Sequence, residues 1–204
     1  MEFVFNAFVT LLVVVDPLGL VPIFGALTQG FSEKQKRESA IRGTMLGGII
    51  LFLFALAGDV LLEALGIGLP AFRIAGGLLL FLLSLDMVFA RPSGMRATAV
   101  REQEEEEYKQ DISVFPLAIP LLAGPGAITA VLLFTGGSST GQVALFMGVL
   151  FVILLLTLGS LLLAPRVMRL LGETGANVLT RVLGVLLSAL AVQFVIDGLQ
   201  SSVA

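Results

Sequence analysis

Asp16-Pro17-Leu18-Gly19 interrupts an apolar segment that otherwise runs over residues 3–27. A segment of this length without Lys or Arg is typical of a membrane-spanning helix, which needs about 20 apolar residues. A carboxylate and a proline are both unfavourable in the middle of such a helix. Because Asp is a preferred N-cap and Pro is tolerated at the first helical position, the stretch predicts a break followed by a second half-helix. We therefore expect Asp16 near the membrane midplane.

A second break is predicted about half a chain later, at Ala123-Gly124-Pro125-Gly126-Ala127 within the apolar segment 113–135. Pro125 follows Pro17 at a separation of 108 residues. Other residues recur at nearly the same separation: Leu65-Gly66 with Leu171-Gly172, Arg73 with Arg181, and Gly76 with Gly184. These matches indicate a duplicated half.

The composition is that of an integral membrane protein, with 57% hydrophobic residues, 13% charged residues and a mean hydropathy of +1.03. The absence of Cys and His excludes disulfides, thiol catalysis and histidine proton relays, and it removes the usual zinc ligands. No nucleophile with a base, no paired carboxylates at the breaks and no phosphate loop is present, so we expect neither an enzyme nor a cofactor or metal site. Nothing supports nucleic-acid binding. The first apolar segment lacks a basic flank and is too long for a signal peptide, so we expect it to be retained.

Six apolar segments predict an all-α membrane protein with six transmembrane helices, of which the first and fourth are broken at mid-membrane. The segments cover residues 3–27, 43–62, 72–89, 113–134, 142–164 and 178–196. Of the 12 Lys and Arg residues, only Arg73 falls on the side of the membrane that holds both predicted termini. Since basic residues are enriched in cytoplasmic loops, both termini are expected outside the cell membrane.

Each predicted half contains three helices, an odd number, so the second half is expected to be inverted relative to the first. Such inverted repeats are common in secondary transporters. We therefore expect a first repeat at residues 1–90, a charged cytoplasmic linker at 91–111 and an inverted repeat at 112–204. The acidic run 102–107 within the linker fits either a solvated connection or a regulatory surface, and the first is the more common role of a charge run.

The inverted layout brings the two half-helices together at one depth with their N-termini facing each other. Helix N-termini carry unpaired N–H groups and the positive end of the helix dipole, which favour an anion such as a carboxylate. Asp16 would attract an ammonium group, a proton or a sodium ion. A small neutral amino acid carries both charges, and it fits a region that we expect to be crowded by small residues. These residues are Gly19, Gly25, Ala26, Gly124, Gly126 and Ala127. The predicted site consists of Asp16, Pro17, Leu18, Gly19, Gly124, Pro125, Gly126, Ala127 and Thr129, with Asp16 also binding the coupling ion.

A purely structural role for these residues stays open. In that role Asp16 only caps a kinked helix, and the glycines only allow the helices to pack tightly. Further polar residues in or beside the apolar segments are weaker candidates, because hydroxyl and amide groups in membrane helices mostly bond their own backbone or a neighbouring helix. They are Asn6, Thr10, Thr28, Ser84, Thr135 and Gln193.

Two stretches resemble the MarC family of prokaryotic inner-membrane proteins: Asp16-Pro-Leu-Gly-Leu-Val-Pro22 and Pro116-Leu-Ala-Ile-Pro-Leu-Leu-Ala-Gly-Pro-Gly-Ala-Ile-Thr129. The resemblance covers the whole chain. It implies six helices, an inner-membrane location and transport of small neutral amino acids such as glycine and alanine, driven by a cation gradient in which protons are favoured over sodium. It also implies a distant likeness to LysE-type amino-acid exporters.

Transport by alternating access is thus the expected function, and three alternatives stay open. They are a LysE-like exporter, a passive channel or facilitator, and a membrane scaffold without transport. A channel needs a continuous polar path, which six helices with few polar residues would supply only as a homo-oligomer. The expected partners are the lipid bilayer and a small neutral amino acid, and a homo-oligomer stays open.

Single-cysteine labelling tests the expected orientation, and it is clean because the chain has no Cys of its own. An impermeant maleimide added outside the cell should modify Ser139→Cys and Ser202→Cys but leave Gln103→Cys unmodified. Labelling of Gln103→Cys alone would show that the orientation is opposite to the predicted one.

Overall fold

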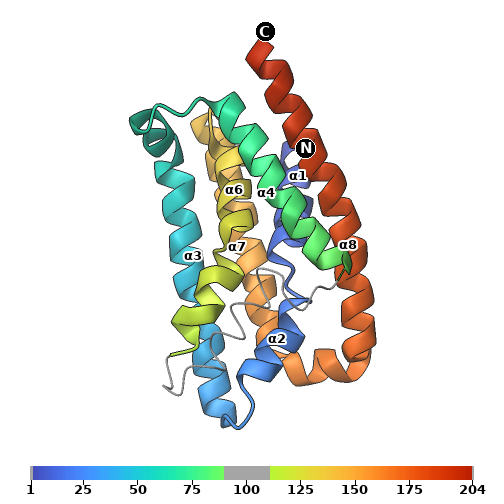
Figure 1. The fold of residues 1–204 in the computed structure, drawn as a ribbon. Coiled ribbons are helices and arrows are strands. Elements are labelled where there is room, and N and C mark those ends of the chain that lie inside the picture. Colours follow the sequence, from blue (N-terminus) through green and yellow to red (C-terminus); the bar gives the residue numbers. More distant parts are fainter. Residues whose placement is uncertain (1, 90–110, 204) are drawn as a thin grey trace.

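A computed structural model describes residues 2–89 and 111–203, and every regular element within these ranges is helical (Figure 1). The elements are α1 (Glu2–Val15), α2 (Leu20–Leu27), α3 (Glu33–Ala64), α4 (Leu69–Phe89), the irregular helical segment η1 (Ser113–Leu122), α6 (Pro125–Thr135), α7 (Thr140–Leu162) and α8 (Ala164–Val203). The predicted linker lies outside the described residues except for Asp111.

The number of membrane spans agrees with the prediction. Within the described ranges, five stretches are long and apolar enough to cross a membrane, and α1 with α2 forms the first of them, Glu2–Leu27. A sixth span results when η1 and α6 are counted together, although they are bent by 52° at the break between them. The prediction of an all-α membrane protein with broken first and fourth helices is therefore confirmed at the level of the helices.

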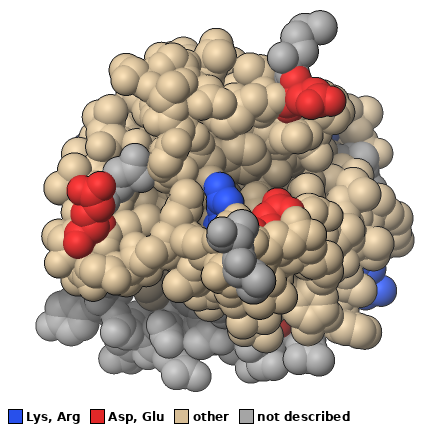
Figure 2. Space-filling view, turned by 90° about the horizontal axis from the view of Figure 1, so that it is seen from above, with Lys and Arg blue, Asp and Glu red and all other residues tan. Residues whose placement is uncertain are grey.

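The helices run back and forth through one bundle, with both ends of the chain at the same end of it (Figure 1). The short α3–α4 and α6–α7 connections lie at this end too, while the α2–α3 connection and the α7–α8 junction lie at the other. Seen from the end that holds the termini, the surface is mostly uncharged (Figure 2). The described basic residues at the opposite end are Lys34, Lys36, Arg37, Arg42, Arg166 and Arg169.

Local structures recur in the two halves at the separation seen in the sequence. α3 and α7 begin with the same capping box, Ser32 with Gln35 and Ser139 with Gln142, in which the Ser hydroxyl accepts a backbone N–H and the Gln side chain accepts the Ser N–H. The packing also matches, because α3 contacts η1 as α7 contacts α1, and α4 contacts α6 as α8 contacts α2. The duplication is consistent with these pairs, and the inverted relation of the halves stays a prediction.

Two of the recurring glycines adopt the left-handed conformation that glycine accepts without a steric cost. Gly66 has φ 66° in the turn after α3, and Gly172 has φ 63° inside α8. At Gly172 the first turns of α8, which lie across the basic end of the bundle, change direction into the long span beside α4 (Figure 1).

α4 and α8 form the most extensive helix contact in the described structure, and glycines bring their backbones together. A Cβ placed on Gly77 of α4 would lie 2.7 Å from the carbonyl oxygen of Ala191, and one on Gly184 of α8 would lie 2.8 Å from Cβ of Met87. Both distances are too short for a real Cβ atom, so small residues are required at these crossings.

Asp111 joins the start of η1 to α3 at the basic end. Its Oδ1 accepts hydrogen bonds from the Ser113 hydroxyl at 2.5 Å and the Ser113 N–H at 3.1 Å, and its Oδ2 lies 3.7 Å from Arg42 Nη1. The pKa of Asp111 is lowered, mainly by the hydrogen bond from the Ser113 hydroxyl. Slight burial raises the pKa, and the Ser113 N–H and the charge of Arg42 lower it further.

We predict that Gly77→Ala lowers the free energy of unfolding by about 1–3 kcal/mol, because the added methyl group collides with the backbone of α8. Gly148→Ala in α7 is the matched control, since no atom lies within 4 Å of its Cβ position. It should raise stability by roughly 0.5–1 kcal/mol through helix propensity. Thermal and denaturant unfolding in detergent measures both, and equal stabilities would contradict the tight α4–α8 contact.

Candidate functional site

Asp16 is the residue at which the first span breaks. α1 ends at Val15, and the Asp16 N–H still donates to the Leu12 carbonyl at 3.0 Å. Asp16 then takes φ 50°, a left-handed value that Asp tolerates better than most side chains do. Its own carbonyl accepts from the Leu20 N–H at 3.1 Å, so Asp16 belongs to the end of one half-helix and to the start of the next.

The Asp16 carboxylate is completely buried and holds two parts of the chain. Its Oδ1 accepts a 3.0 Å hydrogen bond from the Gly19 N–H, three residues further on. Its Oδ2 accepts a 3.3 Å hydrogen bond from the hydroxyl of Thr180 in α8. The Gly19 bond closes the turn at residues 17–19, and α2 begins only at Leu20, with Gly19 as its N-cap and no side-chain cap. The predicted start of the half-helix at Pro17, with Asp16 as its N-cap, is therefore wrong by three residues.

Gly19 makes the contact between Asp16 and Thr180 possible. A Cβ on Gly19 would lie 2.6 Å from Cγ of Asp16 and 2.7 Å from Oγ1 of Thr180, so no larger residue fits without displacing both side chains. Asp16, Pro17 and Gly19 are buried and Leu18 is partly exposed. We call Asp16, Gly19 and Thr180 the carboxylate cluster.

The second break has the same position in its half but no charge. Gly124 precedes α6 in an extended conformation, Pro125 is the first helical residue, and no side chain caps this end. The N–H groups of the first helical turn have no intrahelical acceptor. A Cβ on Gly124 would collide with the Pro120 carbonyl oxygen, so glycine is required here as well.

A small cavity lies directly at the start of α6, with a volume of about 30 Å³. Four of the predicted site residues line it together with parts of α1, α4 and η1; the full set is Val14, Leu83, Pro120, Leu121, Gly124, Pro125, Gly126 and Ala127. A water molecule needs about 10–15 Å³ by a comparable measure, so the cavity holds one or two waters and no amino acid.

The structure thus divides the predicted site into two neighbouring groups. Gly124, Pro125, Gly126 and Ala127 surround the cavity, whereas residues 16–19 belong to the carboxylate cluster and do not line it. Val14, two residues before Asp16, connects the two groups because it lines the cavity and lies 3.5 Å from a Cβ built on Gly126.

Thr129 does not line the cavity, and its methyl group packs against Gly76 of α4. Three of the weaker candidates bond a carbonyl oxygen of their own helix: Ser84, Thr28 and Thr135. Thr10 is different, because its hydroxyl is buried without a hydrogen-bond partner among the described residues.

Gly25 and Ala26 were expected beside the break, and this expectation is wrong. Both are exposed, and Gly25 lines a separate cavity near the basic end. They lie too far along α2, roughly two turns beyond the start of the half-helix at Gly19.

Thr180 is the residue that sequence reasoning missed. It precedes Arg181, one of the matched residues, but the position 108 residues earlier is Phe72, so the duplication offers no hint of a polar role. The one available signal is a hydroxyl at the start of the sixth apolar segment.

Two interrupted spans inside a bundle of apolar helices define a polytopic integral membrane protein. The family model described as MarC family integral membrane protein matches residues 1–203, and the chain belongs to this family.

Curated relatives cover nearly the whole chain. A UPF0056 membrane protein of Archaeoglobus fulgidus is 39% identical over 98% of this chain and 93% of its own. One from Aquifex aeolicus is 39% identical over 96% and 92%, and the UPF0056 membrane protein YhcE of Escherichia coli is 32% identical over 96% and 91%. No solved structure matches this chain. The relatives are thus bacterial and archaeal membrane proteins, whose names state no substrate.

We predict that Gly19→Ala lowers the free energy of unfolding by about 1–3 kcal/mol, because its methyl group displaces Asp16 and Thr180 from their contact. Gly25→Ala in the same half-helix should be neutral or slightly stabilising, since no atom lies within 4 Å of its Cβ position. Unfolding of both purified variants measures the difference, and a Gly19→Ala protein as stable as Gly25→Ala would show that the cluster is loosely packed.

Proposed function

We propose that this protein is a secondary transporter of small neutral amino acids, with glycine and alanine as substrates, that works by alternating access in a prokaryotic inner membrane. The observation that carries the proposal is Asp16. Among the side chains that the structure describes, it is the only buried carboxylate, and it lies where a membrane span is interrupted. An intramembrane carboxylate is costly, and membrane proteins retain such groups mostly where they bind ions or substrates.

The two breaks supply complementary charges for a zwitterion. The first turn of α6 has no side-chain cap and faces the small cavity, so its N–H groups suit the substrate carboxylate. At the other break, Asp16 bonds the N–H of Gly19 just before α2, and its carboxylate suits the substrate ammonium group or the coupling cation. α6 therefore binds the anionic end of the substrate and Asp16 the cationic end.

On this proposal, the described arrangement is a closed conformation of the carrier. The cavity is too small for an amino acid, and Asp16 bonds Thr180 instead of facing it. Binding then requires the Asp16–Thr180 hydrogen bond to open and the breaks to separate by a small movement of one half against the other, as in other transporters built from repeats.

Glycines limit the size of the substrate. A Cβ on Gly126 would lie 2.7 Å from Leu83, so the walls of the cavity are in contact with the backbone at the break. A small expansion of this cavity would make room for glycine or alanine but not for an amino acid with a bulky side chain. The same closed cavity favours a carrier over a passive channel, which needs a continuous open path.

The substitution Asp16→Asn separates a binding role from a capping role. Asn is as good an N-cap as Asp, so the protein should fold with nearly unchanged stability. Loss of a charge-assisted hydrogen bond weakens affinity by about 10- to 150-fold, and we expect gradient-driven uptake of radiolabelled glycine into proteoliposomes to fall below detection. Asp197→Asn, at an exposed residue bonded to Gln193, is the control and should transport normally.

The assay compares imposed proton and sodium gradients in both directions, which also distinguishes import from export. Wild-type uptake by Asp16→Asn, still coupled to the gradient, would reduce Asp16 to a helix cap. Equilibration of glycine by the wild-type protein without dependence on any gradient would favour a passive facilitator, and no flux at all would favour a scaffold.

A further inference from the structure

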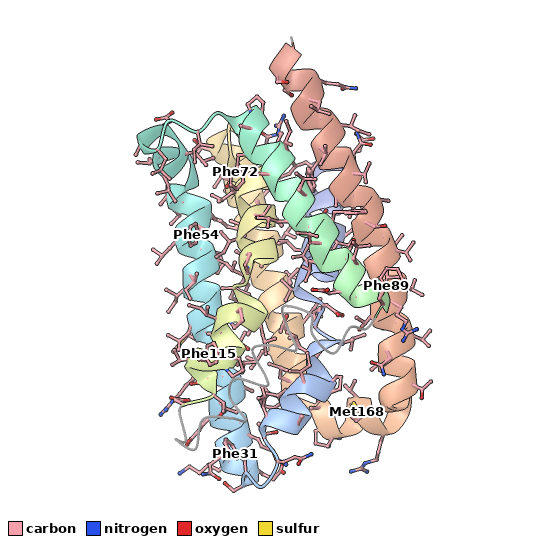
Figure 3. The ribbon with its side chains drawn as sticks, viewed as in Figure 1. Phe31, Phe54, Phe72, Phe89, Phe115 and Met168 are labelled. Atoms are coloured by element: carbon pink, nitrogen blue, oxygen red, sulfur yellow. The ribbon has the colours of Figure 1, made fainter. Side chains whose placement is uncertain are left out.

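A cavity of about 420 Å³ lies away from both breaks, at the basic end of the bundle. It is enclosed by α2, the first turns of α3 and the junction of α7 with α8. Figure 3 shows Met168, one of its lining residues, on the first turns of α8 beside the lower part of α2. Its volume is within the range of about 300–1,000 Å³ that ligand sites occupy.

The walls of this cavity and its mouth differ in chemistry. Side chains from three helices make the wall apolar: Phe24, Leu161, Leu162 and Met168. Lys36 and Arg37, from the first turns of α3, add two cations at the end where the helices leave the bundle. The site is therefore amphiphilic, with its charge at the expected membrane surface.

Arg37 is the cation of the cavity that is available to bind a ligand. Glu33 also lines the cavity, but it pairs with Lys36 at 3.0 Å. Among the side chains that the structure describes, no carboxylate forms an ion pair with Arg37. Its planar guanidinium group is suited to two parallel hydrogen bonds with a phosphate.

Gly25 leaves the cavity open on the α2 side. No atom lies within 4 Å of its Cβ position, so a larger residue would fit and would favour the helix by roughly 0.5–1 kcal/mol. The space next to Gly25 is thus not required for packing of the chain itself.

We propose that this cavity binds one anionic phospholipid from the leaflet at the basic end of the bundle. The headgroup phosphate binds Arg37, because Lys36 beside it is paired with Glu33, and an acyl chain lies against Phe24, Leu161 and Met168. Charge complementarity selects this occupant, because basic pockets between membrane helices on the cytoplasmic side suit anionic headgroups. Arg166 and Arg169 follow Pro165 and Met168 of the lining directly in the sequence and add positive charge at the same end. The site is independent of the proposed transport function.

The test is native mass spectrometry of the purified full-length protein, titrated with phosphatidylglycerol or phosphatidylcholine. We expect one phosphatidylglycerol to bind at concentrations at which phosphatidylcholine does not. Each cation contributes about fivefold to affinity, so Arg37→Gln should weaken binding by about that factor. Lys34→Gln, which removes the same charge from an exposed residue paired with Glu38 outside the cavity, is the control and should change binding by less than twofold.

Gly25→Leu tests the cavity without touching its charges. The leucine occupies the space of the acyl chain, and we expect it to abolish the single tight site, whereas Gly148→Leu on the open face of α7 should leave it intact. Glycerol 1-phosphate, which has the headgroup but no acyl chain, should not compete.

Three results would overturn the proposal. Unchanged lipid affinity in Gly25→Leu would place the lipid on the surface, and equal loss in Arg37→Gln and Lys34→Gln would indicate a diffuse effect of net charge. Competition by glycerol 1-phosphate would assign the cavity to a soluble anion.

Discussion

The structure depends on how the buried carboxyl group of Asp16 is hydrogen-bonded inside the bundle. A buried carboxylate without partners is too costly to persist, and here the Gly19 N–H and the Thr180 hydroxyl each donate to one of its oxygens. Both bonds require a specific backbone: the left-handed turn at Asp16 brings Gly19 within reach, and the missing side chain of Gly19 admits Thr180. Asp16 therefore follows the last turn of α1, bonds the residue that precedes α2 and connects the first span to the last one.

At both breaks a half-helix begins inside the bundle with unpaired N–H groups, and the two breaks differ in what lies beside these groups. At the first break the chain brings its own anion to the positive end of a half-helix. At the second break Gly124 has no side chain, so the positive end of α6 stays uncompensated beside a cavity. The two breaks therefore differ in chemistry, because one holds a buried carboxyl group and the other an uncapped helix N-terminus.

Much of this arrangement follows from local sequence, because Pro17, Pro125 and the flanking apolar lengths restrict the backbone without reference to the rest of the chain. The helices, the breaks and the common end of the termini could be predicted for this reason. Thr180 could not, since its role depends on the distance between two helices that are far apart in the sequence and on the absence of a side chain at Gly19. The division of the site into the carboxylate cluster and the small cavity depends on the direction of each half-helix after its break. The cavity at the basic end depends on the change of direction of α8 at Gly172. The spacing of apolar residues along the chain predicts neither feature.

The close crossing of α4 and α8 limits how the molecule can deform. Gly77 and Gly184 lie at different heights along the pair, and each receives the backbone or the Cβ of the opposite helix. A slide of one helix along the other would bring side chains onto the backbone at both crossings together, so the pair resists shear. α4 and α8 therefore form a rigid pair. We infer that the protein deforms more easily at the short half-helices α2 and α6, which pack against this pair.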